Sequence, residues 1–223
     1  MAEAIDDMGK LKIAVLAGGL STRFGSNKLF YTINGKPLIL YVYERLISIF
    51  DEENIFFIAS PHNAVLLRKI GLSNVLIDDI LKGPISGIYI ALKNLGDVFV
   101  FGGDMPCLNR ELLIEMLNIW IENKFLALVP GWRKGFLEPL HAIYSGELLS
   151  VFEKSISCGE LSITRLINKL DNKKILYLDD YPLEQKLSVY NVNTRDDIRC
   201  VEEGLIKKLP EPCLECLIYR ERS

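Results

Sequence analysis

Short apolar stretches rich in β-branched and aromatic residues alternate with segments whose apolar residues recur every three to four positions. The first pattern predicts buried strands, and the second predicts helices with one apolar face. The predicted strands cover residues 11–17, 54–59, 74–77, 97–101 and 125–129. The predicted helices cover residues 37–50, 64–70, 85–95 and 111–123.

This alternation predicts an α/β fold: a Rossmann-like, mostly parallel, doubly wound sheet with helices on both faces. Beyond Gly131 the pattern loosens, and it predicts strands at residues 137–144 and 187–192 with helices between and after them. We expect residues 1–223 to form a single domain with a core of about residues 11–203 and a short C-terminal tail. Locally, Asn34-Gly35 predicts a turn, and Asn109 predicts the N-cap of the helix that follows it.

Composition narrows the classes of protein that fit this pattern. Hydrophobic residues make up 49% of the 223 positions, which is ample for a large core. The formal net charge of −3 argues against general nucleic-acid binding, which needs a clustered basic surface. No apolar run is long enough to span a membrane, and the first ten residues do not resemble a signal peptide. We therefore expect a cytoplasmic protein with no membrane partner.

The five cysteines do not predict a disulfide framework, because their number is odd and the chain is expected to be cytoplasmic. Cys213 and Cys216 have the spacing of a metal or redox pair, but no second ligand pair accompanies them. A lone pair with this spacing is a weak signal for a metal site, so the sequence disfavours one and leaves the role of the pair open.

The segment of residues 16–28 carries the strongest chemical signal. It follows a predicted buried strand and places three glycines, Arg23 and Lys28 within thirteen positions. Glycines allow backbone N–H groups to approach a ligand closely, and together with the two cations they suit a polyphosphate. The spacing fits neither the dinucleotide-binding nor the P-loop pattern. The alternative is a tight glycine turn with two solvated cations.

Asp104 is the second candidate, because it follows an apolar strand and two glycines and stands directly before Met105-Pro106. Ligands of parallel sheets bind at the carboxyl ends of the strands, so Asp104, Asp78 and the glycine segment should meet at one edge. A lone carboxylate beside a phosphate site is a common way to hold Mg²⁺. The alternative is that Asp104 caps a helix or pairs with a lysine.

Three further segments carry weaker signals. Gly83 and Gly87 flank a predicted helix start, where they would allow close contact with a base or ribose, or would simply connect two elements. Asn191 and Asn193 would share one face of the last predicted strand, and Thr194 with Asp197 forms a capping-box pattern. His141 could act as a general base, although a structural histidine explains it better.

Five segments in order resemble the molybdenum cofactor guanylyltransferases, MobA-type nucleotidyltransferases, over about residues 11–203. The segments are Leu16-Ala17-Gly18-Gly19 with Ser21, Arg23, Gly25 and Lys28; Gly83-Pro84-Ile85-Ser86-Gly87; Gly103-Asp104-Met105-Pro106; Glu138-Pro139-Leu140; and Asn191-Val192-Asn193-Thr194. The first marks the wider nucleotidyltransferase superfamily, and the ordered set is more specific. Ser60 departs from the pattern, because the family often has asparagine after the second strand.

The resemblance implies a role for each matching residue. Leu16, Ala17, Gly18 and Gly19 would hold the guanine nucleotide, and Arg23 and Lys28 would contact its phosphates. Asp78 would lie near the base or ribose, with Gly83 and Gly87 nearby. Asp104 would bind Mg²⁺, and Asn191 and Asn193 would face the pterin.

The implied reaction transfers GMP from GTP to the terminal phosphate of molybdenum-loaded molybdopterin and releases pyrophosphate. Arg23, Lys28 and Asp104 would be the catalytic residues, Mg²⁺ the cofactor, and other molybdenum cofactor proteins transient partners. Ala17-Gly18-Gly19 and Gly83-Pro84 favour GTP, because cytidylyltransferase relatives typically have Ala-Ala-Gly and lack the Gly-Pro form. The alternatives are a molybdopterin cytidylyltransferase, a sugar- or alcohol-phosphate nucleotidyltransferase, and a non-catalytic GTP-binding adaptor.

Overall fold

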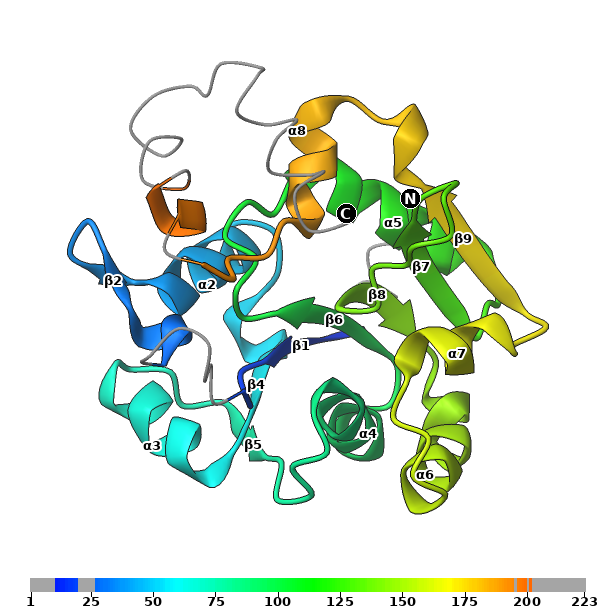
Figure 1. Ribbon diagram of the computed structural model, residues 1–223, viewed down its shortest axis with the longest axis horizontal. Coiled ribbons are helices and arrows are strands. Elements are labelled where there is room, and N and C mark those ends of the chain that lie inside the picture. Colours follow the sequence, from blue (N-terminus) through cyan, green and yellow to red (C-terminus); the bar gives the residue numbers. More distant parts are fainter. Residues whose placement is uncertain (1–10, 20–26, 195, 200, 202–223) are drawn as a thin grey trace.

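The computed structural model describes residues 11–19, 27–194, 196–199 and 201, and a seven-stranded sheet forms its centre (Figure 1). The strand order is β5-β4-β1-β6-β8-β7-β9. The strands are β1 (Lys12–Leu16), β4 (Ile55–Ala59), β5 (Val75–Ile77), β6 (Val98–Gly102), β7 (Ala127–Gly131), β8 (His141–Tyr144) and β9 (Lys173–Tyr177). Only β8 runs antiparallel to its neighbours in this sheet, so the predicted mostly parallel α/β fold is confirmed.

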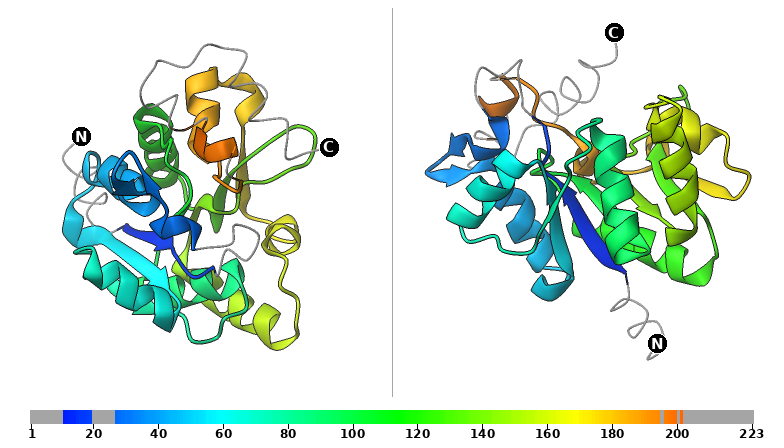
Figure 2. Two further views of the ribbon diagram at one scale, coloured as in Figure 1. Left: turned by 60° about the vertical axis from the view of Figure 1, so that its left-hand side comes forward. Right: turned by 90° about the horizontal axis from the view of Figure 1, so that it is seen from below.

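Helices cover both faces of the sheet, as the two views of Figure 2 show. The α-helices are α2 (Leu38–Ile47), α3 (Pro61–Lys69), α4 (Pro84–Leu95), α5 (Arg110–Glu122), α6 (Leu149–Ser157), α7 (Ile163–Asn168) and α8 (Leu183–Lys186). One apolar cluster joins α2, α3 and α5 to the sheet, and a second joins α4, α6 and α7 to the opposite face.

The central strand β1 shows why the first half of the chain was predictable. Ile13 and Val15 pack into the first cluster and Ala14 into the second, and all three are fully buried. A parallel strand buried on both faces needs a continuous apolar sequence. Burying one large aliphatic side chain contributes roughly 1.5–3 kcal/mol, so such strands leave a clear signal in the sequence.

Smaller elements shape the rest of the chain. A hairpin of β2 (Thr32–Ile33) and β3 (Lys36–Pro37) turns at Asn34 and Gly35, whose φ values are 46° and 82°. The short 3₁₀ helices are η2 (Lys28–Phe30), η3 (Glu52–Asn54), η4 (Gly146–Leu148), η5 (Leu178–Asp180) and η6 (Leu187–Val189). The Asn109 side chain accepts a hydrogen bond from Leu112 N at 2.9 Å, which confirms the predicted N-cap.

Two predictions for the C-terminal half are wrong. Residues 187–192 form no strand: η6 leads into an irregular segment, and Tyr190 and Val192 pack with Ile33 and Leu38 instead of joining the sheet. The edge strand β9 was expected to be helical. Because β9 is only partly buried and opens with two lysines, its sequence lacks the apolar run of the inner strands.

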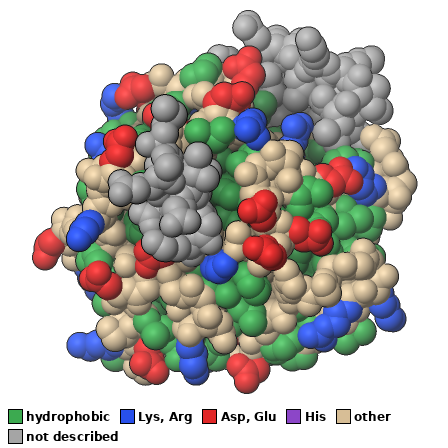
Figure 3. All heavy atoms as spheres, turned by 180° about the vertical axis from the view of Figure 1, so that it is seen from behind, with side chains coloured by type: hydrophobic (Ala, Val, Ile, Leu, Met, Phe, Trp, Pro, Cys, Tyr) green, Lys and Arg blue, Asp and Glu red, His purple; other side chains and the backbone are tan. Residues whose placement is uncertain are grey.

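The described surface carries both signs of charge. On the face drawn in Figure 3, Lys and Arg side chains are interspersed with Asp and Glu. No helix within the described ranges is long and apolar enough to cross a membrane.

His141 belongs to the core at the start of β8. It is fully buried, and its ring lies edge-on to Phe101 with 5.1 Å between ring centroids. Its Nε2 lies 3.4 Å from Ser188 Oγ, and its Nδ1 has no hydrogen-bond partner within the part of the chain described. Burial lowers the pKa of His141 to about 3, so the imidazole stays neutral. A side chain sealed in this way cannot act as a base on a substrate.

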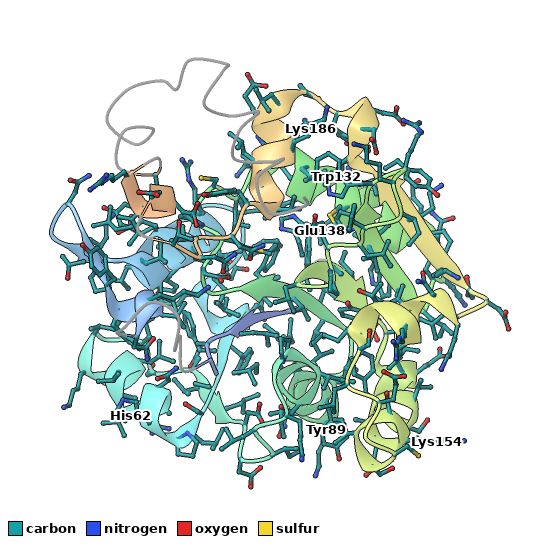
Figure 4. All side chains as sticks on the ribbon, in the orientation of Figure 1. His62, Tyr89, Trp132, Glu138, Lys154 and Lys186 are labelled. Carbon is teal, nitrogen blue, oxygen red and sulfur yellow. The ribbon has the colours of Figure 1, made fainter. Side chains whose placement is uncertain are left out.

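We predict that His141 makes stability fall at acidic pH. Between its unfolded pKa of 6.5 and its folded pKa of about 3, the unfolded chain takes up a proton that the folded protein cannot. From pH 7.5 to pH 5 this group should remove about 2 kcal/mol from the free energy of unfolding. Urea unfolding at both pH values should show a smaller loss for His141→Leu than for wild type. The exposed His62, changed to leucine, is the control (Figure 4); an equal loss in all three proteins would contradict the prediction.

Candidate active site

The carboxyl ends of the parallel strands bring the predicted site segments to one edge of the sheet. β1 leads into Ala17-Gly18-Gly19, β5 into Asp78, and β6 into Gly103-Asp104. β1 lies between β4 and β6, with Leu16 paired to Gly102. Gly103 N then donates to Leu16 O at 3.0 Å, so the glycine segment and Asp104 leave the sheet side by side. The predicted convergence is confirmed for these residues.

Two glycines permit this close approach. A Cβ at Gly103 would lie 3.0 Å from the carbonyl oxygen of Leu16, which is too close for the backbones to stay where they are. A Cβ at Gly102 would lie 2.7 Å from Asp104 Oδ1. Gly103 therefore allows the end of β6 to lie against the end of β1. Gly102 leaves room for the Asp104 carboxylate beside β6.

Lys28 links three segments that are distant in the sequence. Its Nζ donates to Asp104 Oδ2 at 2.5 Å and to Asn193 Oδ1 at 2.8 Å. The Lys28 and Asp104 side chains are only 17% and 16% exposed. Val192 N donates to Asp104 O at 2.9 Å. This bond holds the C-terminal segment, residues 191–194, against the loop that follows β6. A charge-assisted contact between largely buried groups is stronger than an exposed ion pair.

The C-terminal segment is held by a capping box and not by strand pairing. Asp197 Oδ2 accepts from Asn193 N and Thr194 N, and Thr194 Oγ1 accepts from Asp197 N at 3.2 Å. Burial pushes the pKa of Asp197 upward, but hydrogen bonds from Tyr190, Asn193 and Thr194 outweigh it and leave this pKa below its ordinary value. The capping box is confirmed.

Asn191 and Asn193 do not share a strand face, because no strand forms here. Asn193 reaches Lys28, whereas Asn191 Nδ2 donates to the nearby Val189 O at 3.3 Å. The prediction that both face one way rested on a strand between residues 187 and 192, and that basis is wrong.

Asp78 shapes the connection between β5 and α4. It is buried, and its Oδ1 accepts from Ile80 N and Leu81 N, both at 3.1 Å. Ser86 Oγ donates to its other oxygen at 2.7 Å. The carboxylate thereby ties the turn to the first helical turn of α4.

The two glycines around the start of α4 differ in what surrounds them. Gly83 caps α4 with φ 79° and ψ −159°, a conformation that favours glycine, and open space surrounds it. Gly87 is buried, and a Cβ there would lie 3.1 Å from Leu16 Cδ2. In this structure Gly87 therefore brings α4 close to the end of β1.

The sequence did not single out Asn63, a fully buried residue of α3. Its side chain hydrogen-bonds to Ala17 O, Gly19 O and Asn27 Nδ2, at both ends of the glycine segment. Ser60, the position that departs from the family pattern, accepts from Asn63 N at 3.3 Å and caps α3. The local sequence shows this cap but not the distant partners.

Sequence reasoning also missed Trp132, which pairs with Glu138 after the carboxyl end of β7. Trp132 Nε1 donates to Glu138 Oε1 at 2.7 Å, and Figure 4 labels both residues. β7 runs parallel to β6, because both pair antiparallel with β8, so this pair lies at the same edge as Asp104. It fixes one oxygen of Glu138, within the family segment Glu138-Pro139-Leu140.

Some predicted residues cannot be placed. Arg23, Ser21 and Gly25 of the first segment lie outside the described residues, as do Cys213 and Cys216. Within the described ranges no three His, Cys, Asp or Glu side chains gather as a metal cluster.

Comparisons with known proteins agree with this geometry. The profile of the MobA-like NTP transferase domain matches residues 13–173. The probable molybdenum cofactor guanylyltransferase of Thermococcus gammatolerans is 44% identical over 191 residues, covering 86% of this chain and 98% of the relative. That of Pyrococcus furiosus is 45% identical over 186 residues, covering 83% and 93%.

A solved structure shares the architecture as well. The crystal structure of molybdopterin-guanine dinucleotide biosynthesis protein A from Archaeoglobus fulgidus superposes with a TM-score of 0.76 at 27% identity, covering 89% of this chain and all of that one. The profile match, the identity over most of both chains and the shared fold lead to one conclusion. This chain is a nucleotidyltransferase and belongs to the MobA-like NTP transferase family.

Proposed function

We propose that this protein transfers GMP from GTP to the terminal phosphate of molybdenum-loaded molybdopterin and releases pyrophosphate. The observation that carries this proposal is the contact of Lys28 with Asp104 and Asn193, where the central strands β1 and β6 end. Three segments of the family pattern supply these side chains. The relatives are themselves named molybdenum cofactor guanylyltransferases, which supports the choice of donor and acceptor.

The nucleotide would bind on the β1, β4 and β5 side of Asp104. Among the described residues, no atom lies within 4 Å of a Cβ built at Gly19 or at Gly83, so these residues leave both backbones open to ligand atoms. Gly19 continues the Leu16-Ala17-Gly18 backbone, and Gly83 stands at the N-terminus of α4, the end of a helix whose dipole favours an anion. Asp78 would act near the base or ribose by holding this turn, and Arg23 would contact the phosphates.

The oxygen atoms around Lys28 suit a magnesium ion. Mg²⁺ prefers one or two carboxylates together with phosphate oxygens and water, and does not need an all-protein cage. Asp104 and Asn193 offer a carboxylate and an amide oxygen that already lie within reach of the same ammonium group. When bound, the ion would neutralise the triphosphate and make its α-phosphorus more electrophilic.

The chain's own residues would mainly position and neutralise charge. An oxygen of the acceptor phosphate forms the new bond to the α-phosphorus, and the bond to the pyrophosphate oxygen breaks with its electron pair. Lys28 would turn from Asp104 toward the triphosphate and stabilise the charge that develops there. The attacking phosphate is already anionic, so no protein base is required, which agrees with the buried, neutral His141.

The acceptor would lie on the other side of Asp104, toward β8 and β7. Asn193 faces Lys28 at the boundary between the two halves. Glu138, held by Trp132, stands at the β7 exit. We assign Asn193, Asn191 and the Glu138 segment to the pterin side.

Choice of nucleotide tests the proposal directly. Pyrophosphate release should be measured with molybdenum-loaded molybdopterin, Mg²⁺ and each of the four ribonucleoside triphosphates, with product identified by mass. We expect turnover with GTP alone. A preference for CTP would indicate a cytidylyltransferase, turnover only with sugar or alcohol phosphates would indicate another transferase, and nucleotide binding without any turnover would indicate an adaptor.

Replacing the central carboxylate should abolish catalysis without unfolding the protein. We expect Asp104→Asn to lower kcat by about 100-fold or more, because it removes one preorganised charge from the reaction centre. Steady-state pyrophosphate release and the Tm check this. Asp171→Asn is the control, because Asp171 is exposed and precedes β9, away from the carboxyl ends of the strands. Wild-type turnover in a folded Asp104→Asn protein would refute the role of Asp104.

A further inference from the structure

We propose that Asn63 is a positioning residue that holds both ends of the glycine segment and so sets Lys28 relative to the nucleotide-binding backbone. This inference rests on the proposed function, because it concerns the same nucleotide site. Asn63 belongs to α3, makes no hydrogen bond to Lys28 or Asp104 in the described structure, and lies outside the five family segments.

The Asn63 side chain uses both of its polar atoms. Its Nδ2 donates to Ala17 O at 2.6 Å and to Gly19 O at 3.4 Å. Its Oδ1 accepts from Asn27 Nδ2 at 2.6 Å. Both backbone partners are carbonyl oxygens and need a donor, so the orientation of the Asn63 amide is fixed and its oxygen must face Asn27.

The connection continues from Asn27 to the reaction centre. Asn27 Oδ1 accepts from Leu29 N at 3.4 Å, and Asn27 is the N-cap of η2. Lys28 is the first residue of η2, and its Nζ contacts Asp104. The fully buried Asn63 side chain thus links the residues that follow β1 to Asn27, and through Asn27 to the short helix that begins with Lys28.

This link has a function that a simple core contact would lack. Residues 17–19 and residue 28 would bind parts of one ligand, yet they are separated along the chain by a segment of several residues. Ligand affinity depends on how well such groups are arranged before binding. Since Asn63 contacts both ends, it fixes their spacing in advance, and its loss should weaken nucleotide binding more than it slows the chemical step.

Two variants and their combination test this role. Asn63→Leu has a similar shape but makes no hydrogen bonds, and Asn27→Ala removes the other partner from a half-buried position. The control is His62→Ala, which changes the exposed neighbour on the same helix (Figure 4). For each protein, KM and kcat for GTP, the calorimetric Kd of the nucleotide, and the Tm should be measured.

We expect Asn63→Leu to raise KM and Kd about tenfold, in line with the loss of buried hydrogen bonds, while kcat changes by less than about threefold. Asn27→Ala should raise them about threefold. The double variant should resemble Asn63→Leu alone, because both changes break one connected unit. His62→Ala should behave as wild type.

Other outcomes would overturn the proposal. An unchanged KM in folded Asn63→Leu would show that the hydrogen bonds do not position the site. Effects that multiply fully in the double variant would show that Asn63 and Asn27 act independently. If Asn63→Leu does not fold, an unchanged KM and Kd in Asn27→Ala would be decisive against the link.

The proposed function is judged separately. It fails if the wild type shows no turnover with GTP. In that case the Kd of whichever triphosphate the wild type binds most tightly still compares the variants and decides the role of Asn63.

Discussion

The contact between Lys28 and Asp104 requires several other features of the structure. The lysine begins a short helix after the glycine segment, and the aspartate follows β6, so the two meet only because β1 and β6 are adjacent and parallel. Gly103 allows the two strand ends to touch, and Gly102 leaves room for the carboxylate. Both side chains are more than four-fifths buried, so loss of either partner would leave the other charge poorly solvated.

Under the proposed function, the same contact would divide the edge of the sheet into a nucleotide side and an acceptor side. On one side, the backbones of Gly19 and Gly83 would receive the nucleotide, and Asp78 holds the turn between β5 and α4, which contains Gly83. On the other side, Glu138 is fixed by Trp132. An enzyme that joins two phosphorylated substrates needs such a boundary, because the reacting groups must meet in line at one place. Lys28, Asp104 and Asn193 lie at that boundary.

Features with a local cause could be predicted from the sequence. The inner strands need apolar residues on both faces, and a lone carboxylate after two glycines marked Asp104. Features with distant causes could not be predicted. The three partners of the Asn63 side chain are 46, 44 and 36 residues away, and nothing in residues 60–63 beyond a helix cap indicates them. Asn193 was selected on the wrong basis, since a capping box and not a strand brings it to Lys28. β9 was missed because an edge strand needs apolar residues on fewer of its positions.

In the proposed function, Asp104 lies where the metal-bound triphosphate would bind, with Lys28 beside it. The most direct test of this assignment is calorimetric titration of GTP into wild-type protein and the Asp104→Asn variant, each with Mg²⁺ and with a chelator. We expect Mg²⁺ to tighten GTP binding to the wild type by about tenfold or more, because a carboxylate and the phosphates would share the ion. In the variant, Mg²⁺ should change the affinity little. An equal effect of Mg²⁺ on both proteins would contradict the assignment of Asp104.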